Sequence, residues 1–119
     1  MLPTLRQGRR TIWEGLDFEG RPFMDAWPKE VIATGPGAVR NDEMKLELVN
    51  GSIWYVVGSD NYDALVGSNP VGVVFSEYAL TDPAAWEYIR PILAENGGWA
   101  LFIYTPRGRN HAYTLYEMA

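Results

Sequence analysis

The chain has 119 residues with a formal net charge of -5, and hydrophobic residues make up 47% of it. This length and composition predict a single domain over residues 1–119 with its own core. The absence of cysteine excludes disulfides and thiolate metal sites, and the single histidine excludes a histidine-rich site, so only oxygen ligands remain for a metal. The acidic balance argues against a dedicated nucleic-acid-binding module.

Two further function classes are excluded by the distribution of apolar and charged residues. No apolar run reaches the roughly 18 residues of a membrane span, and the N-terminus lacks the basic-then-apolar pattern of a secretion signal. We therefore expect a soluble, cytoplasmic protein without a membrane partner. Positive charge gathers near the two ends, at Arg6, Arg9 and Arg10 and at Arg107 and Arg109. Solubility at polar turns and a phosphate-facing role explain these clusters equally well.

The first forty residues predict little regular structure. Residues 1–10 are polar and favour an irregular segment, and glycine and proline interrupt the apolar positions of 11–27, which favours a short helix or a loop. Residues 34–37 (TGPG) predict a further loop.

Residues 44–57 predict a β-hairpin. Two apolar-rich runs, 44–49 and 52–57, flank Asn50-Gly51, a pair that supplies the positive φ angles of a two-residue hairpin turn. The alternation along both runs predicts one buried face, made of Leu46, Leu48, Ile53, Tyr55 and Val57.

The second half of the chain predicts a strand, a helix and a second strand. Residues 71–75 form a continuous apolar run without alternation, which is typical of a strand covered on both faces. Asp82 is a candidate helix cap with Pro83 at the first helical position, and Pro91 is expected to kink or end that helix. Residues 99–104 form the second apolar strand, and we expect the two strands to be parallel neighbours joined by the helix.

Candidate chemical groups follow both strands, where ligands of open α/β sheets gather. Glu77 follows the first strand and could activate a water for attack on a γ-phosphate, with Ser76 touching the shell of a magnesium ion. A carboxylate that ends a strand and caps the next turn is the commoner explanation of such a pattern. After the second strand, the amides and hydroxyl of residues 105–108 could contact a phosphate, with Arg107 as a mobile cation, although a plain turn is again commoner.

Two other polar features favour structural roles. Asp60, Asn61 and Asp63 offer oxygen ligands, but their spacing does not match a calcium-binding loop, so a solvated loop is favoured. His111 has no cysteine or second histidine to work with, and we expect it at the surface or at a helix start.

Several segments together resemble the ATPase domain of tailed-phage large terminases, the motors that pump viral DNA into capsids. They occur in the family's order within residues 8–118, and they are 58–63 (GSDNYD), 65–67 (LVG), 69–77 (NPVGVVFSE), 89–93 (IRPIL), 96–98 (NGG) and 105–108 (TPRG). The resemblance implies an α/β fold of the partial P-loop NTPase (ASCE) type, a three-layer sheet with a hairpin and two parallel strands. It implies that residues 73–77 are the Walker B strand, with Ser76 in the place of the usual aspartate.

The resemblance also implies the roles of the site residues and the partners. Glu77 would be the catalytic glutamate, and Thr105, together with Arg107, would belong to the motif that couples hydrolysis to DNA movement. The parent family uses ATP and Mg²⁺, and its partners are the terminase small subunit, the portal and viral DNA.

The chain departs from the family at the phosphate-binding loop. Gly8-Arg9-Arg10 resembles the start of that loop, which makes Arg9 and Arg10 candidate nucleotide contacts, but no Gly-Lys-Thr or Gly-Lys-Ser follows. The family's nuclease domain is also missing from these residues. We therefore expect a truncated or internally deleted terminase piece with little ATPase activity alone. The alternative is a non-enzymatic binding or regulatory module that associates with motor subunits or, through an exposed sheet edge, with itself.

Overall fold

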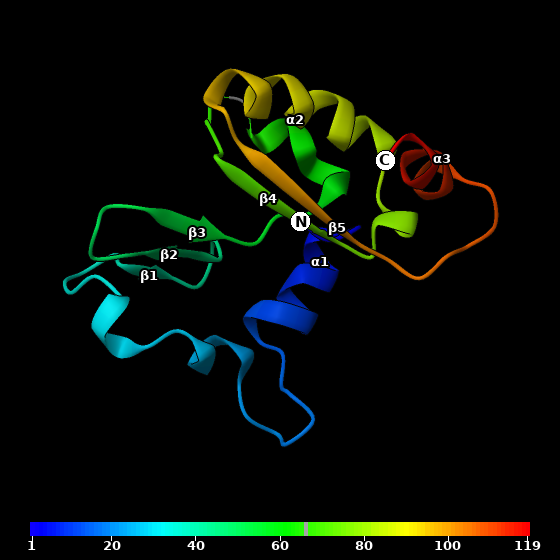
Figure 1. Cartoon of the computed structure of the whole chain (residues 1–119). Helices are drawn as coiled ribbons and strands as arrows, with labels where there is room; N and C mark the ends of the chain where they lie inside the picture. Colours follow the sequence, from blue (N-terminus) through cyan, green and yellow to red (C-terminus); the bar gives the residue numbers. More distant parts are fainter. Residues whose placement is uncertain (66) are drawn as a thin grey trace.

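A computed structural model describes residues 1–65 and 67–119 and shows a mixed α/β chain with two small sheets (Figure 1). Val66, which belongs to the 65–67 segment of the family resemblance, lies outside the described residues. Short 3-10 or π-helical turns occur between the main elements. The main elements are α1 (Leu5–Gly8), β1 (Val39–Arg40), β2 (Lys45–Glu47), β3 (Ile53–Tyr55), β4 (Gly72–Ser76), α2 (Pro83–Asn96), β5 (Trp99–Ile103) and α3 (His111–Met118).

The N-terminal segment is ordered by contacts with distant residues. Met1 lies beside β4, where its carbonyl accepts a hydrogen bond from the Ser76 amide at 2.9 Å, and the Leu2 amide donates to Val57 at 2.9 Å. The Asp60 carboxylate accepts from the Leu5 amide at 3.0 Å and so caps the first turn of α1. The expectation of an irregular 1–10 segment is therefore wrong, because partners more than fifty residues away fix a backbone that local propensity leaves undecided.

The predicted hairpin is confirmed, but its turn is one residue longer than expected. The Leu48 amide donates to the Ser52 carbonyl at 2.8 Å, and the Gly51 amide donates to the Leu48 carbonyl at 2.9 Å, so the loop comprises residues 49–51. Gly51 has a φ of 87°, whereas Asn50 is not among the residues with positive φ. This is a three-residue loop whose glycine occupies the left-handed position.

The longer loop shifts the register of β3 by one residue. Leu46 of β2 pairs with Trp54, and not with Tyr55 as a two-residue turn requires. Leu46 and Val56 are buried, while the Ile53 side chain is 52% exposed. The predicted buried face is correct for Leu46 and wrong for Ile53, because a register shift of one residue moves the side chains of the second strand to the other side of the sheet. Tyr55 and Val57 are half-buried, but they pack against the separate cluster around Phe75 and not beside Leu46.

The predicted strand, helix and strand unit is confirmed. β4 and β5 are parallel neighbours in a register that runs from Gly72 opposite Trp99 to Ser76 opposite Ile103. The α2 helix, drawn in yellow above them in Figure 1, begins at the expected cap, where Asp82 accepts from the Ala84 amide at 3.0 Å.

Pro91 was expected to kink or end α2, and it does not end the helix. The helix continues to Asn96 and stops at Gly97, which has a φ of 63°. Ala85, Ile89 and Leu93 lie four residues apart and are buried on both sides of the proline, which is itself exposed. Packing of this stripe against the sheet holds the helix together where one backbone hydrogen bond is lost.

Only one face of the β4–β5 sheet is covered within the described residues. The core behind it contains Phe75, which is fully buried, and the α2 stripe. On the other face Val74, Trp99, Leu101 and Ile103 are 38%, 56%, 50% and 52% exposed. The expectation of a strand covered on both faces, and of three layers, is therefore not met by these residues.

Candidate functional site

The residues expected to carry chemistry after β4 sit at the carboxyl end of the parallel sheet. Ser76 is the last residue of β4 and forms the last register pair with Ile103. Glu77 follows it with a φ of 58° and a ψ of 45°, the left-handed conformation. For a residue with a long side chain this conformation costs roughly 1–2 kcal/mol, and such strained residues concentrate at functional sites.

The backbone of Glu77 is fixed while its carboxylate is left available. The Glu77 carbonyl accepts hydrogen bonds from the Leu80 amide at 2.9 Å and from the Thr81 hydroxyl at 3.3 Å. Within residues 1–65 and 67–119 the half-buried carboxylate itself makes no ion pair and no side-chain hydrogen bond. The side chain therefore does not cap the following turn, which was the commoner explanation of the sequence pattern.

Helix α3 holds the turn that follows Glu77. Nε2 of His111 lies 2.7 Å from the Tyr78 carbonyl oxygen, and Nδ2 of Asn110 donates to the Ala79 carbonyl at 3.1 Å. The same Asn110 caps α3, because its Oδ1 accepts from the Ala112 amide at 3.1 Å. The helix-start expectation for His111 is confirmed, but its contact with Tyr78 was missed, and so was Asn110. The Asn-His pair ahead of an apolar-periodic segment was the signal that could have indicated a capped helix.

Thr105 and Arg107 lie at the same sheet edge as Glu77. They follow β5 by two and four residues, in an exposed segment without regular secondary structure. Because Ile103 is opposite Ser76, Thr105 and Glu77 come from neighbouring strand ends, as the sequence predicted.

Arg9 and Arg10 do not lie in a loop. Gly8 ends α1, is buried and has helical angles, and a π-helical turn, Arg9–Trp13, continues from it. The Arg9 guanidinium lies 3.4 Å from the Glu14 carboxylate and 3.0 Å from the Asp42 carbonyl. Residues 8–10 therefore do not form a phosphate-binding loop, because helical amides bond within the helix and cannot cradle a phosphate. A nucleotide contact by the Arg9 and Arg10 side chains stays a prediction.

The described residues offer no ready-made metal site. They contain no group of three or more His, Asp or Glu side chains able to hold a metal ion. Asp60 of the acidic loop is occupied with the Leu5 amide, which agrees with the structural role favoured for that loop. A magnesium ion near Ser76 stays a prediction.

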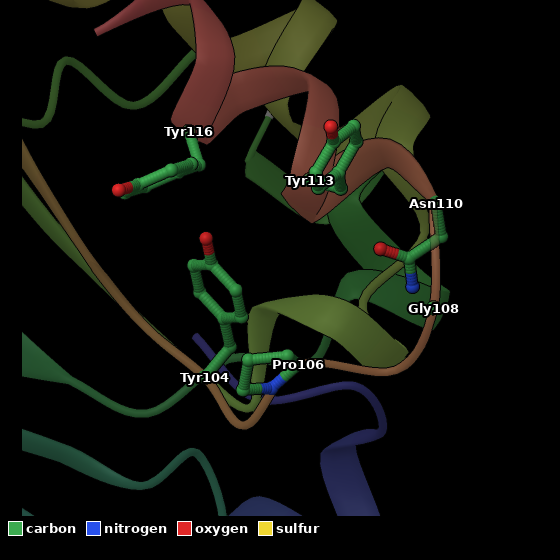
Figure 2. Close-up of a pocket in the computed structure, with 6 residues that line it drawn as sticks. All are labelled: Tyr104, Pro106, Gly108, Asn110, Tyr113 and Tyr116. Carbon is green, nitrogen blue, oxygen red and sulfur yellow. The ribbon is translucent and has the colours of Figure 1, made fainter.

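A pocket of about 380 Å³ opens beside the end of β5, between the 105–110 segment and α3 (Figure 2). The Tyr104 hydroxyl donates to the Ala112 carbonyl at 3.2 Å and the Tyr113 hydroxyl to Glu117 at 2.7 Å. The latter hydrogen bond raises the pKa of Tyr113. The pocket is lined by Tyr104, Pro106, Gly108, Asn110, Tyr113 and Tyr116.

Comparison with known proteins finds a partial relative. Over 71 residues the chain is 34% identical to the terminase large subunit of Escherichia phage T5, and the match takes in 57% of this chain. The same match spans 16% of the phage protein. No family model matches the chain, and no solved structure matches it. None of the helices in the described part of the chain is both long and apolar enough to cross a membrane. The chain thus has a partial likeness to a phage terminase large subunit.

Proposed function

We propose that this chain is a piece of a phage or prophage terminase large subunit and carries the water-activating side of its ATPase site. The observation that carries the proposal is Glu77, a strained residue with an available carboxylate at the end of a parallel strand. The partial identity to the phage T5 large subunit supports the same reading. The parent reaction is ATP hydrolysis that drives viral DNA into a capsid, in the cytoplasm of the host.

Each candidate residue has a distinct role in this proposal. The Glu77 carboxylate accepts the proton of a water molecule, and Ser76 Oγ offers an oxygen to a magnesium shell. Thr105 and Arg107, on the neighbouring strand end, couple ATP hydrolysis at the site to the movement of DNA. The fold of the complete domain is that of a P-loop NTPase, with β4 as the Walker B strand.

The described residues do not fit the phosphate-binding half of such a site. The helical 8–10 segment presents no cradle of free amides, and neither Lys29 nor Lys45 follows the glycine spacing of a phosphate loop. ATP and Mg²⁺ therefore need further ligands in addition to Ser76, and we expect little turnover by this chain alone.

The role of Glu77 is tested by placing this chain in a complete large subunit. The matching segment of the phage T5 protein is replaced by this chain, and phosphate release from ATP is measured. Glu77→Gln is expected to lower the rate at least about 100-fold, the usual effect of removing a general base. Glu95→Gln, on the exposed end of α2, is the matched control and should keep the rate. A Glu77→Gln chimaera as active as its parent would overturn the proposal.

A second candidate function is a non-enzymatic module that associates with motor subunits or with itself. The exposed apolar face of the β4–β5 sheet favours it, because parallel sheets are normally covered on both faces. The terminase small subunit, the portal and viral DNA are partners only within these two proposals. Sedimentation velocity of the chain, alone and with the phage T5 large subunit, separates the two proposed functions. If the chain is a monomer and does not bind the large subunit, the binding module is excluded.

A further inference from the structure

The tyrosine-lined pocket beside β5 does not include Glu77 or Ser76 among its lining residues, although Asn110, which lines it, also holds the turn after Glu77. Its volume of about 380 Å³ falls in the range of small-molecule sites, roughly 300–1,000 Å³. Figure 2 shows the ring of Tyr104 rising from the end of β5 toward α3, with Tyr116 and Tyr113 across the opening. Pro106, another lining residue, lies next to Tyr104 in the same view.

The aromatic walls differ in how firmly they are held. Hydrogen bonds fix the Tyr104 and Tyr113 hydroxyls to Ala112 and Glu117, so these two rings are oriented before any ligand arrives. The Tyr116 side chain is 72% exposed. An oriented ring opposite an exposed one is an arrangement that can take up a flat aromatic group by stacking.

Two arginines neighbour the lining residues of the same pocket. Arg107 lies between the lining residues Pro106 and Gly108, and the guanidinium carbon of Arg109 lies 5.7 Å from the centre of the Tyr113 ring. Both arginines are exposed, and neither makes an ion pair in the part of the chain that the structure describes. The carboxylate of Glu117 is close to these arginines in sequence and accepts a hydrogen bond from the Tyr113 hydroxyl at Oε1.

We propose that this pocket binds a nucleobase that carries a phosphate, with the base stacked on Tyr116 and Tyr104 and the phosphate contacted by Arg107 or Arg109. Aromatic rings that stack bases beside cations that contact phosphates are the shared means of binding unpaired nucleotides. The ligand is either a free nucleotide or an unpaired nucleotide of a strand. The net charge of -5 opposes long nucleic acids and favours a weak, local interaction.

The test uses the 119-residue chain and two probes, AMP and a short fluorescein-labelled oligothymidylate. Binding is followed by chemical shifts of the tyrosine rings for AMP and by anisotropy for the oligonucleotide. Binding of AMP alone indicates a free nucleotide, and binding of the oligonucleotide indicates a strand. Adenosine, which lacks the phosphate, should bind at least about threefold more weakly than AMP. Failure of both probes to bind overturns the proposal.

The variants separate stacking from general surface effects. Tyr116→Ala should weaken binding at least about fivefold, the lower end of what one stacked base contributes, while Tyr116→Trp keeps it. Met118→Ala is the matched control, because Met118 lies on the same helix and is also 72% exposed. Equal binding by Tyr116→Ala and Met118→Ala would contradict the proposal. Glu77→Gln should bind both probes normally, so a failure here is distinct from a failure of the ATPase proposal.

Discussion

The imidazole Nε2 of His111 lies 2.7 Å from the carbonyl oxygen of Tyr78, and the two rings meet edge to face with centroids 5.0 Å apart. Helix α3 is thereby tied to the first residue after Glu77. The strained backbone of Glu77 persists only if its surroundings hold it in place. The His111 contact is one such restraint, and the link from Asn110 to Ala79 is another.

Removal of the His111 hydrogen bond should destabilise the protein without loss of its fold. His111→Phe keeps a ring against Tyr78 and removes one of two hydrogen bonds to its carbonyl, which still accepts from the Thr81 amide at 3.0 Å. It should lower the free energy of unfolding by about 0.5–1.5 kcal/mol in urea denaturation. Tyr113→Phe, which removes the exposed hydroxyl bond to Glu117, is the control and should change it by less than about 0.5 kcal/mol. Equal losses of unfolding free energy in the two variants would show that the hydrogen bond from His111 to Tyr78 contributes no more to stability than an exposed one.

Relief of the backbone strain at Glu77 should stabilise the chain. Glu77→Gly removes the Cβ that disfavours a φ of 58°, and it should raise the free energy of unfolding by about 0.5–1 kcal/mol after the extra entropy of unfolded glycine is counted. Glu77→Ala keeps the Cβ and should show no such gain. If Glu77→Gly is the less stable variant, the carboxylate contributes more to folding than its geometry indicates.

The amine of Met1 should make stability depend on pH. Burial lowers the pKa of this amine from 8.0 to about 6, so between these pH values the unfolded chain binds more protons than the folded one. Stability therefore rises with pH through this window and is fully present above about pH 8. The total loss as the pH falls from above 8 to below 6 is about 3 kcal/mol, because the pKa differs by about two between the unfolded and the folded chain. Thermal unfolding of the N-terminally acetylated chain, whose amide can still donate to Val74, should lack this contribution. Identical pH profiles for the two forms would rule it out.

The strand, helix and strand unit could be predicted because local and long-range signals agree there. Asp82 and Pro83 mark the helix start, and two short apolar runs flank the helix. The contacts of residues 1–10 could not be predicted, because they depend on partners such as Asp60 and Val57 that are close only after folding. At the site, the position of Glu77 and Thr105 at neighbouring strand ends followed from topology. No sequence pattern predicts the left-handed backbone of Glu77 or the contact between His111 of α3 and the Tyr78 carbonyl.

The length of the hairpin loop sets the strand register and with it the exposure of Ile53. Ile53→Ser should change the free energy of unfolding by less than about 1 kcal/mol, because the side chain is 52% exposed, whereas Leu46→Ala should cost about 2–4 kcal/mol. A two-residue turn would bury Ile53 beside Leu48 and predicts a large loss for both variants. Urea denaturation distinguishes the two registers, and Val49→Ser, at an exposed loop position, is the neutral reference.

The uncovered face of the β4–β5 sheet should govern self-association. Leu101 lies in the middle of β5 on that face and is 50% exposed, and β5 carries no charge or proline that would protect its open edge. Leu101→Lys places a charge at the centre of the face and should shift the chain toward monomer in sedimentation velocity and delay aggregation on heating. Leu80→Lys adds the same charge at a residue that is 47% exposed but lies outside the sheet, and it should leave association unchanged. If the two variants behave alike, net charge and not this face controls association. If the unmodified chain is already monomeric at high concentration, this face does not mediate self-association.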